Sequence, residues 1–315
     1  MRKIQRTPDP SQMIYEIDTE RKRTILGVQT RALNAMITEL IRKDFDWVLP
    51  VTLAKSTDPL WPDPGASIEK RIEINIYDQT VRTMQSMIVH KLVLSSLGPN
   101  KFFIISPNIR IETRKRAISG WHLYEFTQLE TEISGAKMQD VFGLYEDLVK
   151  SAIHAVEHDV SKLRKTKLHV PKTPFKVYTR KEIEQKYGKD WEQSAPEKES
   201  NPFWLTDIPR EFYDFQDEAT GAWRNYDLFM PEGYGEVLSG AEREFEYSKI
   251  VKKIERDGVK KDEYTFLLNL AKDRKLKPCA GAGLGIERFI AYLCGVSHVA
   301  DVQPFPRIPG LVPPL

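Results

Sequence analysis

The chain has 315 residues, of which 41% are hydrophobic and 29% charged, and its formal net charge is +2. These values are typical of a soluble globular protein and exclude a largely disordered chain. The near-balanced charge gives no sign of strong non-specific binding to nucleic acid.

Cys279 and Cys294 are the only cysteines. They have no CxxC spacing, which excludes a zinc knuckle and a disulfide framework and favours a reducing, cytoplasmic location. No apolar run approaches the length of a membrane span, so no membrane association is expected.

The N-terminal third predicts an arm, a helix and two strands. Residues 1–23 are charged and contain two prolines, so they read as an arm. Apolar residues at helical spacing predict a helix over residues 24–43. FDWVLPVTL then predicts a strand with Pro50 in its middle, which proline permits only at an edge or a special junction. The proline-rich segment of residues 55–69 predicts a loop, and RIEINIYDQT, residues 71–80, predicts a second strand.

MQSMIVHKLVLSSLG predicts a helix ending at Gly98. Residues 102–132 then predict two antiparallel strands joined by a long basic loop. Residues that alternate along a strand share a face of the sheet. One face of this hairpin would carry an anion-binding arginine, an aromatic ring and hydrogen-bonding side chains. Such a set of side chains could bind a nucleotide next to a polar substrate. These residues are Arg110, Glu112, His122, Phe126, Gln128 and Glu130.

The C-terminal half predicts an amphipathic helix over residues 138–156 and a surface excursion over residues 162–200. Asp227 lies in a strand-like Tyr-Asp-Leu, and Glu236, Ser239 and Arg243 follow in the order Gly-Glu-x-x-Ser-Gly-x-x-Arg. Carboxylate and hydroxyl oxygens suit Mg²⁺, and an arginine forms a bidentate fork with a carboxylate.

Gly281, Gly283 and Gly285 alternate through a predicted strand, followed by Glu287 and Arg288 at the start of an apolar helix. Glycine is unfavourable in a strand unless another group must approach the backbone closely. The spacing is not that of a Rossmann turn, because GAGLGIER has no third glycine at the required offset.

Three of these segments resemble the motifs of class II aminoacyl-tRNA synthetases, in the aspartyl/asparaginyl branch. The helix and proline-containing strand resemble motif 1, and Arg-x-Glu, a loop and His-x-x-Glu-Phe-x-Gln-x-x-x-Glu resemble motif 2. Gly-x-Gly-x-Glu-Arg, with the trailing VQPFPR, resembles motif 3. The resemblance implies an α+β catalytic domain over residues 24–315, built on a mostly antiparallel sheet flanked by helices. It also implies a homodimer formed through residues 24–53.

The resemblance assigns the nucleotide contacts. Arg110 would hold the α-phosphate of ATP and Glu112 the adenine side. Phe126 and Arg288 would stack on the two faces of adenine, with His122 near the terminal phosphates. Arg110 and Arg288 are the expected catalytic residues, since catalysis would be positioning and charge neutralisation during in-line attack of a carboxylate on the α-phosphate.

Asp227, Glu236 and Ser239 would surround a Mg²⁺ ion. Where the family has Arg-His at the end of the motif 2 loop, this chain has Trp121 and His122. One phosphate-facing cation is therefore lost unless Arg114 or Arg116 replaces it.

The resemblance also assigns the amino-acid contacts. Lys91 and Arg243 would bind a carboxylate of aspartate, and Gln128 and Glu130 its activated end and amino group.

Ser86 and Lys91 lie in a segment similar to the family's QSPQLFKQ, in which Ile88 replaces the second glutamine. In the loop of residues 55–69, Asp58 is the candidate for closing over the amino acid, with Asp63 behind it.

The short arm cannot supply the five strands of the OB fold with which this branch reads the anticodon. Together with PLWPDP, PREFYD, GYGE and VQPFPR, this makes the chain similar to archaeal asparagine synthetases derived from the branch. The resemblance implies synthesis of asparagine from aspartate, ATP and ammonia, with release of AMP and with tRNA binding not expected. Glutamine as the nitrogen source would require a glutaminase partner, because neither cysteine lies in a nucleophile motif.

Two alternatives remain open. One is a truncated synthetase paralogue that aminoacylates a tRNA or a protein, and the other is a non-catalytic module that binds ATP or an amino acid.

Overall fold

The computed structural model describes residues 8–60 and 68–315. In this part of the chain, the main sheet has eight strands, and the six central ones are antiparallel. The outermost strand at each edge runs parallel to its neighbour. In spatial order the strands are β1 (Asp46–Trp47), β6 (Lys101–Ile109), β8 (Glu125–Ser134), β13 (Cys279–Gly285), β12 (Gly235–Glu242), β11 (Asn225–Met230), β10 (Phe203–Thr206) and β9 (Lys176–Thr179).

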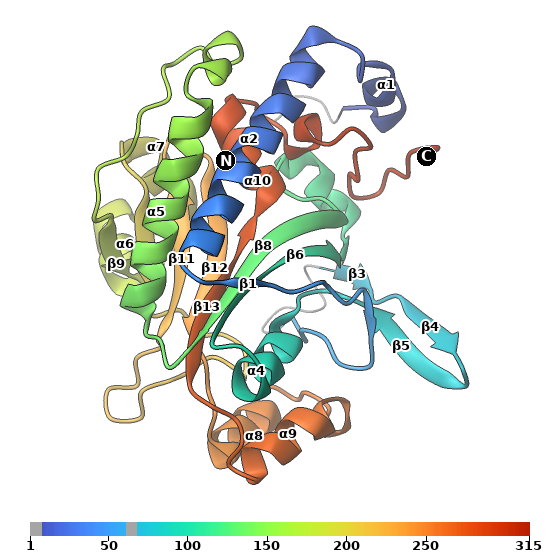
Figure 1. The fold of residues 1–315 in the computed structure, drawn as a ribbon, viewed down its shortest axis with the longest axis vertical. Helices are drawn as coiled ribbons and strands as arrows, with labels where there is room; N and C mark the ends of the chain where they lie inside the picture. Colours follow the sequence, from blue (N-terminus) through green and yellow to red (C-terminus); the bar gives the residue numbers. More distant parts are fainter. Residues whose placement is uncertain (1–7, 61–67) are drawn as a thin grey trace.

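Helices flank this sheet (Figure 1), so the predicted α+β architecture with a mostly antiparallel sheet is confirmed. The described α-helices are α1 (Pro10–Tyr15), α2 (Glu20–Arg42), α4 (Ile88–Leu97), α5 (Met138–Val156), α6 (Arg180–Tyr187), α7 (Trp191–Lys198), α8 (Tyr247–Arg256), α9 (Thr265–Lys272) and α10 (Ile286–Cys294). None of the helices in residues 8–60 and 68–315 is both long and apolar enough to cross a lipid bilayer.

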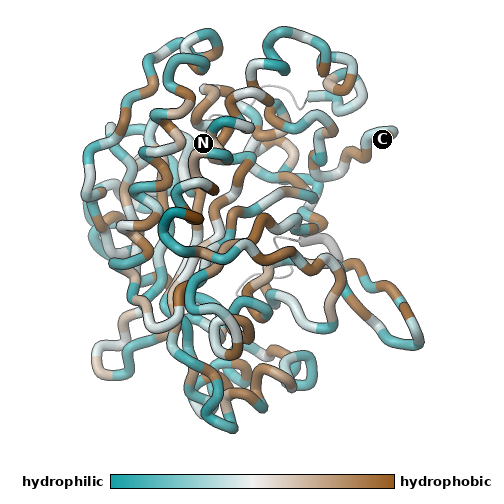
Figure 2. The backbone as a smooth tube through the Cα atoms, viewed as in Figure 1, coloured by the Kyte–Doolittle hydropathy of each residue, from teal (hydrophilic) through white to brown (hydrophobic). Residues whose placement is uncertain are grey.

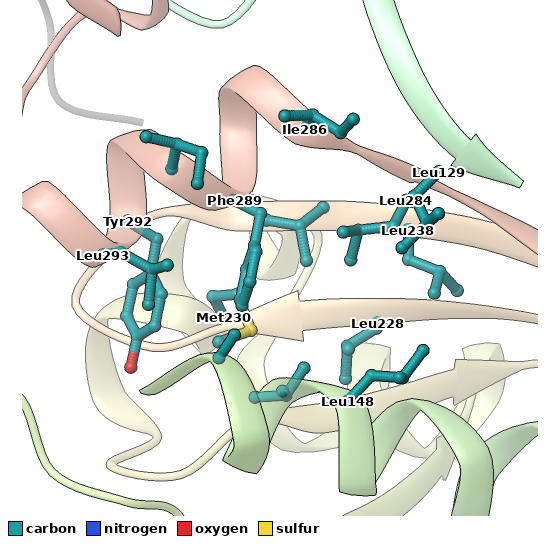
Figure 3. Packing of buried hydrophobic residues seen from close by; sticks show 14 of the residues in the cluster. Leu129, Leu148, Leu228, Met230, Leu238, Leu284, Ile286, Phe289, Tyr292 and Leu293 are labelled. Atoms are coloured by element: carbon teal, nitrogen blue, oxygen red, sulfur yellow. The ribbon is translucent and has the colours of Figure 1, made fainter. Parts of the chain in front are cut away.

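One face of the sheet forms the main core. The strand register aligns four leucines across four neighbouring strands, and they pack against α5 and α10 (Figure 3). These residues are Leu129, Leu284, Leu238 and Leu228. Figure 2 shows hydrophobic residues following the central strands. Each of these strands therefore has a buried apolar face and an opposite face that is free for other groups.

The next register row lies on that opposite face. It places Glu130, Gly283, Ser239 and Asp227 side by side on β8, β13, β12 and β11. Adjacent residues of a strand point to opposite faces of the sheet. The register that buries the leucine row therefore also places this polar row on the other face.

Helix α2 begins earlier than predicted. Thr19 caps it, because the side-chain oxygen accepts a hydrogen bond from the Lys22 backbone N–H at 3.3 Å. Its buried residues recur every three or four positions and face α5 and the core. The N-terminal segment contains α1, and Lys22 Nζ donates to the Asp301 carbonyl oxygen at 2.7 Å. The segment is therefore joined to the C-terminal part of the chain.

Two predicted strands differ from the structure. Residues 45–53 form only the two-residue strands β1 and β2 (Leu53–Ala54), with Pro50 between them, because proline cannot donate to a ladder. Residues 71–80 form parts of two strands, β4 (Glu73–Ile76) and β5 (Gln79–Thr83). Tyr77 and Asp78 lie between them with φ of 47° and 58°, as a two-residue hairpin turn requires.

The hairpin of β4 and β5 extends away from the body of the molecule (Figure 1). Strands β2, β5 and β4 make a small sheet, and β3 (Ile68–Lys70) pairs with β7 (Ile111–Glu112). The short 3₁₀ helices are η1 (Arg114–Ser119), η2 (Asp159–Lys162), η3 (Lys261–Tyr264) and η4 (Val299–Val302).

Residues 162–200, for which the sequence predicted a surface excursion, include β9, α6 and α7. Strand β9 completes one edge of the main sheet, and Ile183 and Trp191 pack against Phe203 of β10. This segment therefore contributes a small core of its own.

Candidate functional site

A cavity of about 350 Å³ opens over the polar face of the central sheet. Of the fourteen site residues predicted from the sequence, all but Asp227 line it. Those residues are Asp58, Ser86, Lys91, Arg110, Glu112, His122, Phe126, Gln128, Glu130, Glu236, Ser239, Arg243 and Arg288. Asp227 is 3% exposed and is bonded to Arg210, which also lines the cavity. Asp63 lies outside the described residues.

Glycines on β13 make room for the side chains of β8. A Cβ atom on Gly281 would overlap the Thr131 carbonyl oxygen and the Glu132 carboxylate. A Cβ on Gly283 would lie 2.9 Å from Gln128 Nε2. The alternating glycines are therefore required by the close approach of Glu132 and Gln128, which point across β13.

Two arginines and a ring form one end of the cavity. Arg110 Nε donates to the Gln85 carbonyl oxygen at 2.9 Å, and its guanidinium lies over the Phe126 ring at 5.2 Å from the centroid. Arg288 Nε donates to the Trp121 carbonyl oxygen, and Nη1 to that of Glu236, both at 3.1 Å. Backbone acceptors thus hold both guanidinium groups in place before any ligand arrives.

The first residues of α10 also fix the sheet beneath the ring. The Thr127 backbone N–H donates to both carboxylate oxygens of Glu287, at 3.0 Å each. Glu287 therefore positions β8 next to Phe126, and both Glu287 and Arg288 line the cavity.

Arg116 lies beside His122 at the arginine end of the cavity. Its Nη1 lies 2.8 Å from His122 Nε2 and 3.3 Å from Glu112 Oε2, and it lines the cavity, whereas Arg114 does not. Ser119 Oγ lies 2.7 Å from His122 Nδ1 and donates to the Arg116 carbonyl oxygen. This network assigns the His122 proton to Nδ1 and leaves Nε2 as an acceptor from arginine.

His122 is neutral in this environment. Burial, together with the nearby Arg288, Arg116 and Arg110, lowers the pKa of His122 to about 2. The positive charge at this end of the cavity therefore belongs to the arginines. Burial also raises the pKa of Glu112 above its ordinary value.

A pH dependence of stability follows. The unfolded chain binds a proton at His122 below about pH 6.5 and the folded chain does not, so stability falls as the pH decreases from 6.5. We expect wild type to lose about 2 kcal/mol more than His122→Gln between pH 6.5 and 5, as measured by urea unfolding. The other buried histidines contribute equally to both proteins, so identical pH dependences would contradict this assignment.

Buried charges form the other end of the cavity. Lys91 Nζ lies 3.0 Å from Glu130 Oε2 and 3.3 Å from Glu132 Oε2. Arg243 Nε lies 3.1 Å from Glu132 Oε1, and its Nη1 lies 3.2 Å from Asp214 Oδ1. Burial alone would raise the pKa of Glu132, but Arg243 and Lys91 hold it below its ordinary value. Glu132 therefore remains ionised and fixes both cations.

Two further carboxyl groups, those of Asp58 and Glu211, line the cavity together with these cations. Asp58 Oδ2 accepts a hydrogen bond from the Tyr213 hydroxyl at 3.0 Å, and its Oδ1 accepts one from the Leu60 N–H at 2.8 Å. Glu211 also lines the cavity. Burial, with Asp58 and Asp214 nearby, raises the pKa of Glu211 well above its ordinary value.

Ser86 lies near the start of α4. Its Oγ accepts a hydrogen bond from the Ile88 N–H at 3.3 Å, and its carbonyl oxygen accepts one from the Thr57 hydroxyl at 3.4 Å. Ser86 therefore lines the cavity as part of a fixed turn.

Asp227, Ser239 and Glu236 lie near one another, and arginines contact all three. Arg210 bonds Ser239 Oγ and Asp227 Oδ2, and Arg288 Nη1 lies 3.6 Å from Glu236 Oε1. Asp227 Oδ1 is buried and has no hydrogen-bond partner within the described chain. An orphaned carboxylate oxygen beside a second carboxylate and a hydroxyl fits a hard divalent cation. Burial raises the pKa of Asp227 to about 7.

Sequence reasoning assigned no role to several cavity residues. Arg210, Glu211 and Asp214 line the cavity and come from the connection between β10 and β11. Glu132 of β8 does not line the cavity itself but fixes Lys91 and Arg243, which do. The charged segment PREFYD is the signal that could have identified the first three. The pairing of Glu132 with two cations depends on the packing of α4 and on the end of β12.

Comparison with known proteins agrees with this geometry. Residues 10–309 match the family described as tRNA synthetases class II (D, K and N). The asparagine–tRNA ligase of Pyrococcus abyssi is 26% identical over 314 residues, a match that covers 92% of this chain and 69% of the relative. That of Thermococcus gammatolerans is 28% identical over 266 residues, covering 77% of this chain and 60% of the relative.

A solved structure shows the same fold. The asparaginyl-tRNA synthetase from Pyrococcus horikoshii complexed with asparaginyl-adenylate superposes with a TM-score of 0.85 at 23% identity. The superposition covers 97% of this chain and 73% of that chain. This confirms the expected synthetase fold and does not single out the asparagine synthetases. The chain belongs to the class II tRNA synthetases of the D, K and N type.

Proposed function

We propose that this chain is an ATP-dependent ligase that activates aspartate as an aminoacyl-adenylate and releases pyrophosphate. One observation carries the proposal: a single cavity joins the Arg110–Phe126–Arg288 end to the Lys91–Arg243 end. Phe126 and Glu130 are four residues apart on β8, a span of about 13 Å. That length suits an adenine ring at one end and an amino acid at the other.

The aspartate assignment depends on the hydrogen-bonding capacity of the two buried cations. Lys91 has three N–H donors, and Glu130 and Glu132 take two. Arg243 has five, and the contacts with Glu132, Asp214 and the Gly281 carbonyl oxygen take four. One donor on each cation is left, which suits the two oxygens of one carboxylate.

Activation would depend on position and charge. Arg110 and Arg288 would neutralise the α-phosphate as the carboxylate attacks in line, while Phe126 stacks on adenine and Glu112 contacts its edge. Gln128 and Glu130 would orient the amino acid.

Asp227, Glu236 and Ser239 would hold Mg²⁺. When bound, the ion would neutralise charge on the ATP phosphates. The side chains of this chain would set its position, and Glu236 would also remain next to Arg288.

The similarity to tRNA ligases supports transfer of the activated amino acid to tRNA. This was the alternative in the sequence analysis, and it fits the comparisons better than asparagine synthesis does. The expectation that tRNA is not a partner is therefore not supported, and tRNA becomes the first acceptor to test.

Ammonia is the second candidate acceptor, which would make the chain an aspartate–ammonia ligase. A specific observation favours it: the Glu211 carboxyl group lines the cavity close to Asp58 and Asp214, at the amino-acid end. Its raised pKa makes its carboxylate a stronger base than usual, so it could take the proton from ammonium. Sequence reasoning could not name such a base.

A homodimer through residues 24–53 also belongs to this proposal, with residues 24–315 as the catalytic domain and residues 1–23 as the arm. From the last turn of α2 to β2 the chain exposes a run of large apolar side chains, which is the surface expected of a protein interface. They are Ile41, Trp47, Leu49, Val51 and Leu53. Figure 2 shows further hydrophobic residues on the neighbouring β4–β5 hairpin.

The test is an assay with purified protein, ATP, Mg²⁺ and aspartate, following pyrophosphate exchange, AMP and asparagine. Exchange that depends on aspartate would support activation, and no exchange with any amino acid would refute it, leaving an ATP- or amino-acid-binding module. Aminoacylated product after addition of total tRNA would identify tRNA as the acceptor. Asparagine and AMP appearing only with ammonium, and lost in Glu211→Gln, would identify ammonia.

Lys91→Met is expected to raise the KM for aspartate by about 10²-fold, because one of the two free donors for its carboxylate disappears. Lys253→Met is the matched control. Lys253 is also a buried lysine, 3.0 Å from Glu244 Oε2, but it does not line the cavity. Similar KM values in the two variants would show that Lys91 does not bind the substrate.

A further inference from the structure

Arg210 lies where the family chemistry would place a metal ion. It belongs to the connection that follows β10, in a segment without helix or strand. Its guanidinium reaches β11 and β12, donating through Nη1 to Ser239 Oγ and through Nη2 to Asp227 Oδ2. Asp227 and Ser239 are direct register partners on those strands, so one planar fork spans both residues.

The guanidinium and a divalent cation therefore compete for the same oxygens. Two of the three proposed metal ligands are already bonded to Arg210. With both carboxylates ionised, the charge of Asp227, Glu236 and Arg210 together is −1, compared with −2 for the two carboxylates alone. A nearby fixed positive charge also repels an incoming Mg²⁺ ion.

Arg210 does not satisfy all the oxygens of this site, so a metal ion could take its place. Asp227 Oδ1 is buried and has no hydrogen-bond partner within the described residues, although the other oxygen of the same carboxylate is bonded to Arg210. The Arg210 side chain is 20% exposed, whereas that of Arg243 is 5% exposed and held by two carboxylates and a backbone carbonyl. Arg210 can therefore turn toward the cavity, and Arg243 cannot.

We propose that Arg210 is a resident cation that closes the metal site of the nucleotide-free chain, so that the divalent ion enters together with ATP. Phosphate oxygens of ATP would act as additional ligands of the divalent ion, and would also accept hydrogen bonds from the Arg210 guanidinium once it leaves Asp227 and Ser239. The inference rests on the proposed ATP chemistry, since it concerns the ion that the Asp227 site receives.

The experiment measures Mn²⁺ binding by the electron paramagnetic resonance signal of free Mn²⁺, without nucleotide and then with a non-hydrolysable ATP analogue. Arg210→Met is expected to bind Mn²⁺ about tenfold more tightly than wild type without nucleotide, because a competing cation has been removed. With the analogue, the difference should shrink to about threefold or less. Binding requires no turnover, so this result is independent of whether aspartate is the substrate.

Arg224→Met is the matched control. Arg224 is paired with Asp217 at 3.3 Å in the same connection but does not line the cavity, so its loss should leave Mn²⁺ affinity unchanged. Adding Asp227→Asn to Arg210→Met should abolish the gained affinity.

Equal Mn²⁺ affinity in wild type and Arg210→Met would overturn the proposal, as would a gain that survives the Asp227 substitution. Thermal unfolding checks that each variant is folded. If Arg210→Met is not, Arg210→Lys keeps the charge but cannot span both oxygens, and should still bind Mn²⁺ more tightly than wild type. No gain in the folded lysine variant would count against the proposal in the same way.

Discussion

Replacing Arg288 by alanine is expected to lower aspartate-dependent pyrophosphate exchange by about 10²–10³-fold, with little effect on stability. The guanidinium is positioned by the carbonyl oxygens of Trp121 and Glu236 before any ligand binds, so it requires no reorganisation as charge develops on the α-phosphate. Arg288→Lys should recover only part of the activity, because an ammonium group cannot make the same fork.

Arg114→Ala is the control for this experiment. Arg114 belongs to the basic segment η1 but does not line the cavity, so its loss should leave exchange within about twofold of wild type, as for most surface substitutions. If Arg288→Ala retained wild-type exchange while remaining folded, the phosphate end of the cavity would have to lie elsewhere.

The second large effect is expected in the sheet. Gly281→Ala should destabilise the protein by about 3 kcal/mol or more, because the new methyl group would overlap a backbone carbonyl of β8 and the Glu132 carboxylate. Neither group can move freely: Thr131 is in a ladder between two strands, and Glu132 is fixed by Lys91 and Arg243. Urea unfolding at fixed protein concentration measures the loss.

Two further glycines make the comparison quantitative. Gly143 lies on the exposed side of α5 with nothing within 4 Å of an added Cβ, so Gly143→Ala should stabilise by about 1 kcal/mol. At Gly283 the added Cβ would meet only the end of the Gln128 side chain, so the stability loss should be smaller than at Gly281. Equal losses at Gly281 and Gly143 would refute the close-approach explanation.

Local patterns predicted the elements that carry the motifs. The alternation in residues 102–132 gave the β6–β8 pair, and the apolar spacing of residues 138–156 gave α5 with its observed bounds. The alternating glycines predicted a close approach on β13, and the structure shows that Glu132 and Gln128 cause it. These signals are local, because strand and helix periods are written in neighbouring residues.

Local patterns failed where a partner strand or a turn decided the outcome. Residues 71–80 alternate like one strand, yet two successive residues with positive φ, Tyr77 and Asp78, fold them into a hairpin. Residues 162–200 are charged and proline-rich, yet β9 is held by pairing with β10. The edge of β10 to which β9 bonds exists only in the assembled sheet, so the sequence of residues 162–200 does not reveal it.

The chain's residues specify the family, the three motifs and the mostly antiparallel sheet, because each depends on spacing along the chain. Tertiary structure decides the chemistry of the cavity. It brings Arg210, Glu211 and Asp214 from the connection between β10 and β11, places Glu132 between two cations, and excludes the proton from His122. The burial of a site residue and the charges around it come from groups that are distant in sequence. Both are therefore set only when the elements pack together.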